Sequence, residues 1–355
     1  MTSGSNIPHK SDSAPTSSTR KIVTYALRFG VPLVISVGLC YLLFAKQDFG
    51  EMVRIVRSDC NYWWIVLALG ISVFSHVFRA MRWNIQLRAL NIRAGLWTLT
   101  LSVFGTYAVN LVFPRLGEIW RSGYVAQKED ASFTTVFGSM IAERVADLVT
   151  VIILTCCTLV FAGRQMVNYL RQNEDMYMKV MELLTSPWLW SIVVALIAAI
   201  VLVFVYLPHN AVVVKAKELC AGVWKGFAVI ATMPGKGKWL FYTVCIWGCY
   251  FLQLYVAFFA FPATAEVVAL YGIPAVMVCF VLSSISMGVP SNGGIGPWQW
   301  AIMFGLSMYT AGIPQLTQSY AASFANLVMG SQTLLLIALG LLTFASIAVQ
   351  RRRAK

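Results

Sequence analysis

An apolar stretch at residues 111–125, LVFPRLGEIWRSGYV, contains a helix breaker followed by three charged residues. Arg115, Glu118 and Arg121 have i, i+3 spacing, so they form one stripe on a helix that starts at Pro114. A helix N-terminus that carries cations attracts anions. The pattern predicts an anion site beside the break. The alternative is an interfacial helix whose arginines lie against lipid headgroups.

A second charged group lies inside the apolar sequence FGSMIAERVADLVTVIIL. Glu143 and Asp147 share a helix face at i, i+4, and Arg144 lies about 100° away from them. On a helix that starts at Phe133, these residues lie roughly 15 Å along the axis, deep in a bilayer. Charges at that depth are costly and face a partner or a wet cavity. They indicate a ligand site or a structural ion-pair network that joins this helix to residues 111–125, and the two interpretations are compatible.

Two further arginines, Arg79 and Arg82 in SHVFRAMRWNIQL, have i, i+3 spacing at the cytoplasmic end of a predicted helix. Guanidinium groups are permanently charged bidentate donors, so this pair suits a phosphate. Arginines that anchor a helix at the membrane boundary are an equally ordinary alternative.

The elements that must position these residues are membrane helices. Hydrophobic residues make up 59% of the chain and charged residues 12%, with a mean hydropathy of +0.72, against roughly 25% charged residues in soluble domains. A span needs about 20 apolar residues, and stretches of that length occur at 25–44, 61–80, 133–162, 188–207, 239–261 and 319–349. Weaker stretches lie at 97–113, 275–289 and 298–312. The longest polar stretch, about 207–238, is too short for a soluble catalytic domain of roughly 100 residues.

The cysteines, histidines and glycines form no recognised catalytic pattern. The 8 cysteines show neither metal-ligand nor disulfide spacing, and no metalloprotease, nucleotide-binding or hydrolase motif occurs. We therefore expect no metal, no cofactor and no enzyme of the soluble type. The net charge of +13 is assigned to membrane orientation and anionic lipid, and no nucleic-acid partner is expected.

The distribution of Lys and Arg indicates that the weak stretch 97–113 does not cross the membrane. If every apolar stretch crosses and the N-terminus is inside, 11 basic residues lie inside and 15 outside, against the positive-inside rule. If 97–113 dips into the membrane and returns through 115–130, the balance becomes 20 inside and 6 outside. The sequence predicts a re-entrant hairpin that breaks at Pro114 and Gly117.

A matching break lies in SSISMGVPSNGGIGPWQW, residues 283–300, where Pro290 and Gly293 repeat the spacing of Pro114 and Gly117. We expect a second hairpin by analogy; two full spans are the alternative, because this loop carries no charge. Its hydrogen-bonding side chains and exposed backbone amides belong to Ser291, Asn292, Gln299, Gly293, Gly294 and Gly296. A simple turn between helices explains the glycines equally well.

Each half of the chain is then expected to contain two helices, a hairpin and a third helix. Because each half crosses the membrane three times, an odd number, the second half has the opposite orientation in the membrane. The predicted fold is an all-α polytopic membrane protein with about six full spans and two opposed re-entrant hairpins, or eight spans if the second hairpin crosses fully. A single transmembrane domain covers 25–350, with halves at about 25–165 and 188–350. Residues 1–24 form a disordered cytoplasmic tail and 351–355 a basic cytoplasmic tail. Paired Gly/Pro-interrupted segments are typical of inverted-repeat transporters, whose site lies where the broken helices meet.

Four sequence motifs together resemble a known family. FRAMRW, FPRLGEIWRSGYV, ERVADL and VPSNGGIG, in this order, are similar to the lysylphosphatidylglycerol synthase transmembrane region, a flippase-like domain family, over roughly residues 20 to 350. The resemblance implies a multi-pass protein of the bacterial inner membrane, related to the lipid-translocating half of two-part aminoacyl-phospholipid synthases. The soluble transferase of those proteins has no counterpart before RRRAK, so synthase activity is not expected.

The resemblance also implies which residues line a translocation cavity. They are Arg115 to Arg121, Glu143 to Asp147 and Pro290 to Gly296. One departure is Gln299, because family members often carry an acidic residue shortly after the glycine motif.

The function we expect is translocation of a phospholipid or another anionic lipid-linked molecule. The phosphate would pair with Arg115 and Arg121, helped by Arg79 and Arg82, while the carboxylates orient the arginines or contact a cationic headgroup. Membrane lipids, and a separate lipid-modifying enzyme, are the expected partners. The alternatives are an ion- or proton-coupled solute transporter, a membrane enzyme that uses Glu143 or Asp147 as a base, and a noncatalytic partner subunit.

Overall fold

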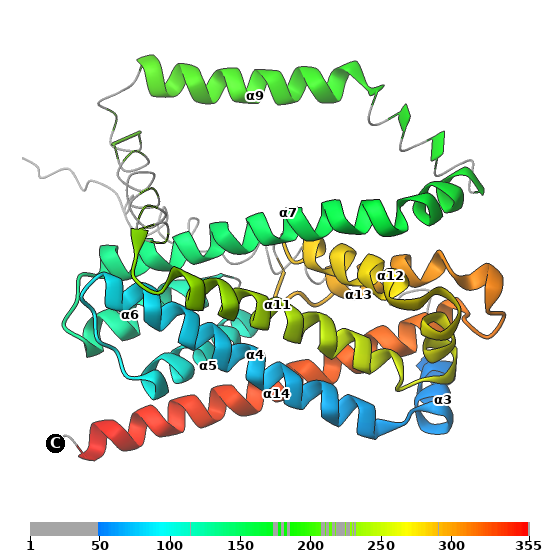
Figure 1. The fold of residues 1–355 in the computed structure, drawn as a ribbon, viewed down its shortest axis with the longest axis horizontal. Helices are drawn as coiled ribbons and strands as arrows, with labels where there is room; N and C mark the ends of the chain where they lie inside the picture. The colour runs from blue at the N-terminus through cyan, green and yellow to red at the C-terminus, as the bar shows by residue number, and fades with distance from the viewer. Residues whose placement is uncertain are drawn as a thin grey trace, which may run out of the picture.

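The structure is a computed structural model that describes residues 49–113, 115–172, 185–206, 232–289 and 291–353, with single residues and pairs between 177 and 230. Its regular elements in this part of the chain are all helical (Figure 1). They are α3 (Phe49–Asp59), α4 (Tyr62–Ala89), α5 (Leu96–Val112), α6 (Leu116–Lys128), α7 (Phe133–Gln172), α9 (Pro187–Tyr206), α11 (Lys236–Phe258), α12 (Pro262–Ser286), α13 (Pro297–Ser307), a 3-10 turn (Thr310–Gly312) and α14 (Gln318–Arg353).

Five of these helices are long and apolar enough to cross a membrane: α4, α7, α11, α12 and α14. The predicted spans 61–80, 133–162, 239–261 and 319–349 are confirmed as such helices. The predicted tail 1–24 and span 25–44 lie outside the described residues. Helix α9 coincides with the predicted span 188–207 and lies apart from the packed helices (Figure 1); its crossing stays a prediction. The predicted basic tail begins as helix, because α14 continues to Arg353.

The first predicted hairpin consists of α5 and α6, which pack against each other. At 1.5 Å per residue, they are about 26 Å and about 20 Å long, less than the roughly 30 Å of a hydrocarbon core. Gly117 is required at their closest approach, because a Cβ there would collide with Thr106 O, and its N–H donates to Asn110 Oδ1 at 2.8 Å. The helix begins at Leu116, after Arg115 in the left-handed conformation (φ 61°). The predicted start at Pro114 lies outside the described residues.

The second hairpin is formed by the end of α12 and by α13. Although α12 as a whole is long enough to cross, Gly272 (φ 68°, ψ −161°) breaks it just before Pro274. The arm that remains, residues 273–286, is about 21 Å long, and α13 is about 17 Å long. Both arms are therefore shorter than a full span, which favours the hairpin over two crossings. Pro290, in the connecting loop, lies outside the described residues.

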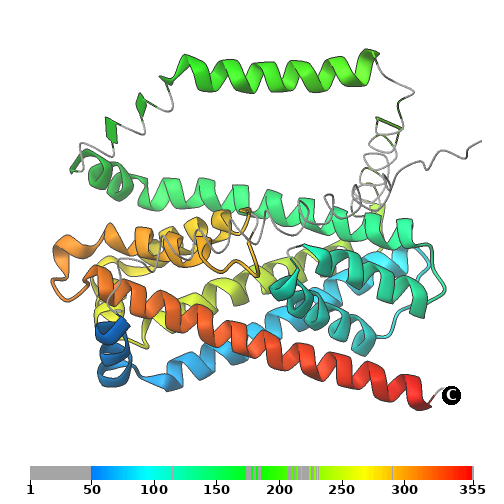
Figure 2. The same ribbon diagram turned by 180° about the vertical axis from the view of Figure 1, so that it is seen from behind.

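The helix pairs repeat between the halves in the manner of an inverted repeat. Helix α4 packs against α11, its counterpart in the other half. The last helix of each half packs against its own hairpin, α7 against α6 and α14 against α13, and also against the opposite hairpin, α7 against α12 and α14 against α5. The two views of the ribbon show the hairpins entering from opposite ends of the bundle (Figures 1 and 2).

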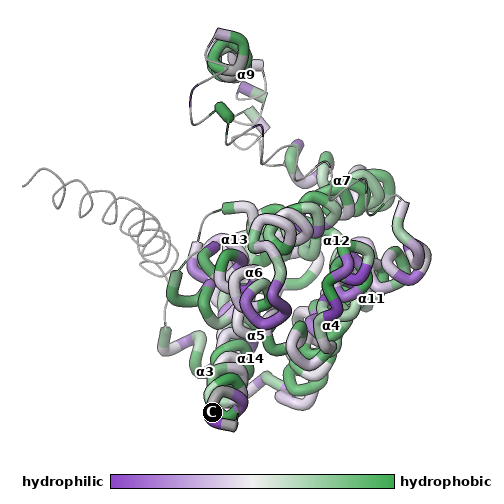
Figure 3. Tube along the Cα trace, turned by 90° about the vertical axis from the view of Figure 1, so that its left-hand side faces the viewer, coloured by the Kyte–Doolittle hydropathy of each residue, from purple (hydrophilic) through white to green (hydrophobic). Residues whose placement is uncertain are grey.

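Hydrophilic residues gather at the end of the bundle that carries the C-terminus (Figure 3). A hydrogen bond from Lys128 Nζ to Gln350 Oε1, at 2.7 Å, ties the ends of α6 and α14 together there. The apolar core has two parts. One surrounds Trp83 and Leu99 between α4 and the first hairpin, and the other surrounds Phe258 and Phe324 around α11, α12 and α14.

Candidate functional site

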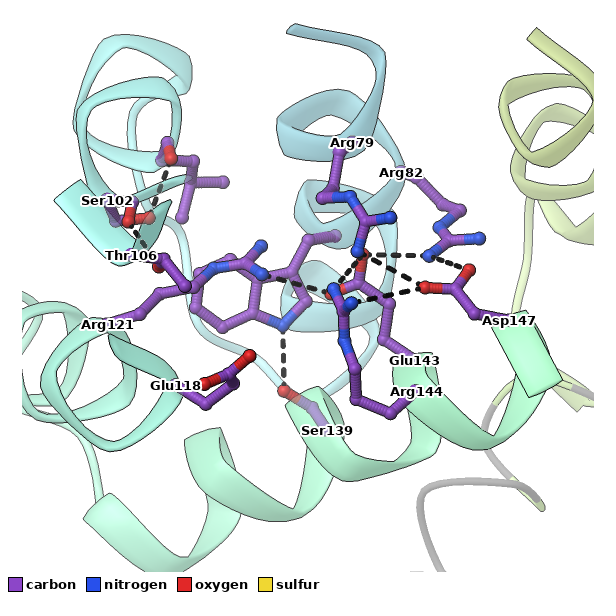
Figure 4. A network of polar contacts seen from close by, with 12 residues as sticks. Arg79, Arg82, Ser102, Thr106, Glu118, Arg121, Ser139, Glu143, Arg144 and Asp147 are labelled. Carbon is purple, nitrogen blue, oxygen red and sulfur yellow. Dashed lines mark hydrogen bonds and ion pairs between the residues drawn. The ribbon is translucent and has the colours of Figure 1, made fainter. Parts of the chain in front are cut away.

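A buried ion-pair network, here called the charged network, joins α4, α6 and α7; its members are Arg79, Arg82, Arg121, Glu143, Arg144 and Asp147 (Figure 4). Arg82 is fully buried at its centre. Its Nη2 donates to Glu143 Oε1 and to Asp147 Oδ1, both at 2.8 Å. Arg79 Nη1 donates to Asp147 Oδ2 at 3.2 Å. The i, i+3 and i, i+4 spacings place these pairs on the facing sides of α4 and α7. The predicted ion-pair link from α7 to the first hairpin is a different contact, between Glu143 and Arg121.

Arg121 attaches the first hairpin to this network. Its Nη1 donates to Glu143 Oε2 at 3.3 Å, and its guanidinium lies 3.8 Å from the centroid of the Trp83 ring. The Trp83 indole is itself fixed, because Nε1 donates to Ser139 Oγ at 3.0 Å. Arg121 is therefore held by both Glu143 and the Trp83 ring and is only 1% exposed. It positions the hairpin and does not reach the cavity described below.

Arg144 is the most accessible member of the network, with a side chain that is 38% exposed. Its Nη1 lies 3.5 Å from Asp147 Oδ2 and its Nη2 lies 3.9 Å from Glu143 Oε1, which are long contacts. Four guanidinium groups thus share two carboxylates, and the network has a formal charge of +2. Several buried N–H groups also find no hydrogen-bond acceptor among the described residues: the Nε atoms of Arg79, Arg82, Arg121 and Arg144, and Arg121 Nη2.

An uncompensated positive charge inside an apolar bundle is costly. An anion bound beside the network would offset this charge, because guanidinium groups bind phosphate and carboxylate through paired hydrogen bonds.

A partly open cavity of about 320 Å³ lies against the network. Arg79, Arg144 and Asp147 form its charged end, and the walls include the apolar side chains of Leu254, Phe280, Val328, Met329 and Leu336. Both hairpins contribute, through Tyr107 of the first and Ser283, Ser284 and Gly293 of the second. The cavity therefore lies where the opposed hairpins meet.

The hairpin tips are in direct contact beside this cavity. Arg115 Nη2 donates to Gly288 O at 2.8 Å, across 173 residues of sequence. A Cβ added to Gly293 would lie 2.6 Å from Leu111 Cδ2, so glycine lets the tips approach without displacing the Leu111 side chain. Its φ of 62° is a second reason for glycine at this position.

The prediction that Arg115, Glu118 and Arg121 form one stripe on a helix face is wrong. Arg115 precedes the helix in the left-handed conformation, so it turns to the tip contact and away from Arg121. Glu118 accepts hydrogen bonds from Asn110 Nδ2, at 3.3 Å to each oxygen, and so braces α6 against α5. None of the three lines the cavity.

The second hairpin supplies fewer ligand groups than the sequence suggested. Gln299 is buried, and its Oε1 accepts from Gly296 N at 2.8 Å, which caps the start of α13. Asn292 is half-buried in the loop and, like Gly294 and Gly296, does not line the cavity. Gly293 is the one glycine of the described loop that reaches it.

Sequence reasoning missed the uncharged side chains of the cavity, which come from four different helices: His76, Tyr107, Tyr250, Gln253 and Gln332. No spacing along the chain connects them. Their one signal is that they are polar residues inside otherwise apolar stretches.

The fold and the site define a polytopic α-helical membrane protein in which opposed hairpins enclose a positively charged cavity. The sequence profile of the family described as "Lysylphosphatidylglycerol synthase TM region" matches residues 30–340, so the chain belongs to this family, which confirms the resemblance seen in its motifs. A curated relative, "Glycosyltransferase AglD" of Haloferax volcanii, is 28% identical over 135 residues. That match covers 38% of this chain and 22% of the relative, so the chain spans less than a quarter of its length. No solved structure matches.

Proposed function

We propose that this protein translocates a phospholipid or another anionic lipid-linked molecule across its membrane. One observation carries the proposal: the cavity at the meeting point of the hairpins joins a network of formal charge +2 to apolar walls. The positive charge can bind a phosphate, and the apolar walls can accommodate an acyl or prenyl chain. Opposed broken elements around a central site are the architecture of alternating-access transporters.

In this mechanism the phosphate binds Arg144 and Arg79, the two arginines that line the cavity. Arg79 is held in place by Asp147 and by Tyr250, whose hydroxyl accepts from Arg79 Nη2 at 3.1 Å. Arg82 and Arg121 act as positioning residues, because both are buried behind the carboxylates. We therefore propose Arg79 and Arg144 as the phosphate ligands in place of Arg115 and Arg121.

Access to either side requires the hairpins to separate. The contact from Arg115 to Gly288 O is a single hydrogen bond between tips, which opens at small cost when the halves rock apart. The charged network ties the first hairpin to α4 and α7, so these elements move as one body.

We also propose that the membrane is the inner membrane and that both termini are cytoplasmic. The support is the basic residues at the end that carries the C-terminus, where Lys128 lies against Gln350 and α14 ends in three arginines, because the positive-inside rule places such residues on the cytoplasmic side. A separate lipid-modifying enzyme is the proposed partner.

Reconstitution tests the proposed activity. The protein is incorporated into phosphatidylcholine vesicles with fluorescent phosphatidylglycerol, and movement between leaflets is followed by dithionite quenching. We expect faster movement than in protein-free vesicles and loss of that acceleration in Arg144→Gln, since this change removes a phosphate ligand. Arg164→Gln, at an exposed site on the same helix, is the matched control and should remain active. Equal rates with and without protein, for every anionic lipid of the host membrane, contradict the proposal.

A further inference from the structure

The cavity has a second polar region that carries no charge. Gln253 Nε2 donates to Gln332 Oε1 at 3.1 Å, and Gln332 Nε2 donates to Ser72 Oγ at 2.7 Å. These two hydrogen bonds connect α11, α14 and α4, and both glutamines line the cavity. Gln253 Oε1 has no hydrogen-bond partner among the described residues, so it is an acceptor that remains available to a ligand.

His76 belongs to the same region. It is only 3% exposed, it lines the cavity, and both its ring nitrogens lack hydrogen-bond partners in the described part of the chain. Its ring lies 4.6 Å from that of Tyr107, centroid to centroid. Leaving a buried polar group without a partner is costly. An imidazole has one donor and one acceptor in its neutral form, which matches a hydroxyl group in either direction.

The cavity offers no free carboxylate to a cationic headgroup. Asp147 is the only acidic side chain among the described residues that line it. Its oxygens already contact Arg79 and Arg82 at 3.2 and 2.8 Å, and Arg144 at 3.5 Å. A lysyl or other amino headgroup would therefore bring a further positive charge to a site that already has an excess, which is unfavourable in a low-dielectric interior.

We infer that the cavity holds a subsite for hydroxyl groups, built from His76, Gln253 and Gln332. This inference rests on the proposed function and specifies its substrate class: a phosphate ester whose headgroup is neutral and hydroxylated, such as a glycerol or a sugar. The phosphate binds at the arginine end, the hydroxyls hydrogen-bond at the glutamine end, and Tyr107 and Tyr250, whose hydroxyls lie 3.4 Å apart, stand between them.

Binding of matched lipids by the purified full chain in detergent tests the subsite. Each of three unlabelled lipids competes with fluorescent phosphatidylglycerol for the protein. The first is phosphatidylglycerol itself. The second is phosphatidylmethanol, which has the same phosphodiester charge but no hydroxyl, and the third is lysylphosphatidylglycerol, which has a cationic headgroup. Two to three hydrogen bonds make phosphatidylglycerol bind about tenfold more tightly than phosphatidylmethanol. Lysylphosphatidylglycerol binds more weakly than either.

Gln332→Leu and His76→Phe should bind phosphatidylglycerol no better than phosphatidylmethanol, while their affinity for phosphatidylmethanol stays at the wild-type value. Gln318→Leu, at an exposed site of the same helix as Gln332, should keep the tenfold preference. Equal affinities in the wild type, tightest binding of lysylphosphatidylglycerol, or loss of phosphatidylmethanol binding in both variants overturns the inference.

The same preparations are assayed for translocation. Translocation without headgroup preference overturns this inference and leaves the proposed function intact. Headgroup preference without translocation overturns the proposed function and leaves the subsite intact.

Discussion

Arg82 and Glu143 form a completely buried ion pair at 2.8 Å, and the other oxygen of Glu143 contacts Arg121 of the first hairpin. One carboxylate thus connects α4, α6 and α7. Both of its oxygens are used and its side chain is completely buried, so its loss leaves buried guanidinium groups with one counter-ion fewer and removes the ion pair that holds the first hairpin.

Glu143→Gln is therefore expected to lower the free energy of unfolding by about 3–5 kcal/mol, the range for removing one partner of a buried pair. The measurement is thermal unfolding in detergent, followed by aggregation or by thiol labelling. Glu266→Gln, at an exposed position of α12, should leave the unfolding temperature unchanged. A neutral effect of Glu143→Gln would mean that the arginines find other counter-ions.

Arg121→Lys should also destabilise the protein, although the charge is kept. The guanidinium plane lies 3.8 Å from the Trp83 ring centroid while it donates to Glu143, and an ammonium group cannot do both. We expect a loss of about 1–2 kcal/mol of unfolding free energy. Arg88→Lys, on the exposed face of α4, is the control. Equal unfolding temperatures for the two variants would show that stacking contributes little.

Gly117→Ala tests the close packing of α5 on α6. The added Cβ would collide with the backbone carbonyl of Thr106, so the hairpin must open, at a cost of about 1–3 kcal/mol. Gly123→Ala on the same helix meets nothing within 4 Å and should be neutral or stabilising. Comparable melting curves for both alanine variants would contradict the packing described.

Local patterns made the network and the hairpins predictable. Charges inside apolar stretches are rare enough to mark Arg79, Glu143 and Asp147, and their helical spacing fixes which ones share a face. The count of basic residues on each side favoured a hairpin at 97–130, and α5 and α6 are two short helices that pack against each other there.

The pairings themselves could not be predicted, because they join residues distant in the chain. Arg82 and Glu143 are separated by 61 positions and Gln253 and Gln332 by 79, and no periodicity encodes such contacts. Arg115, whose left-handed conformation splits the predicted stripe, likewise bonds to a distant residue, Gly288. The break in α12 has a local signal in Gly272 and Pro274, which apolar length alone does not reveal.

The two hairpins come from opposite ends of the bundle and meet tip to tip, and a disulfide between the tips is the sharpest test of this contact. A Cβ at position 293 would lie 4.0 Å from Leu111 Cα, so the backbones at the two positions are close enough for cysteine side chains to meet. In a background without native cysteines, Leu111→Cys combined with Gly293→Cys should form an intramolecular disulfide on mild oxidation, seen as protection from maleimide labelling. Leu111→Cys combined with Gly330→Cys, whose Cβ meets nothing within 4 Å, should stay reduced. Free thiols at 111 and 293 after oxidation, in a folded protein, would contradict the account.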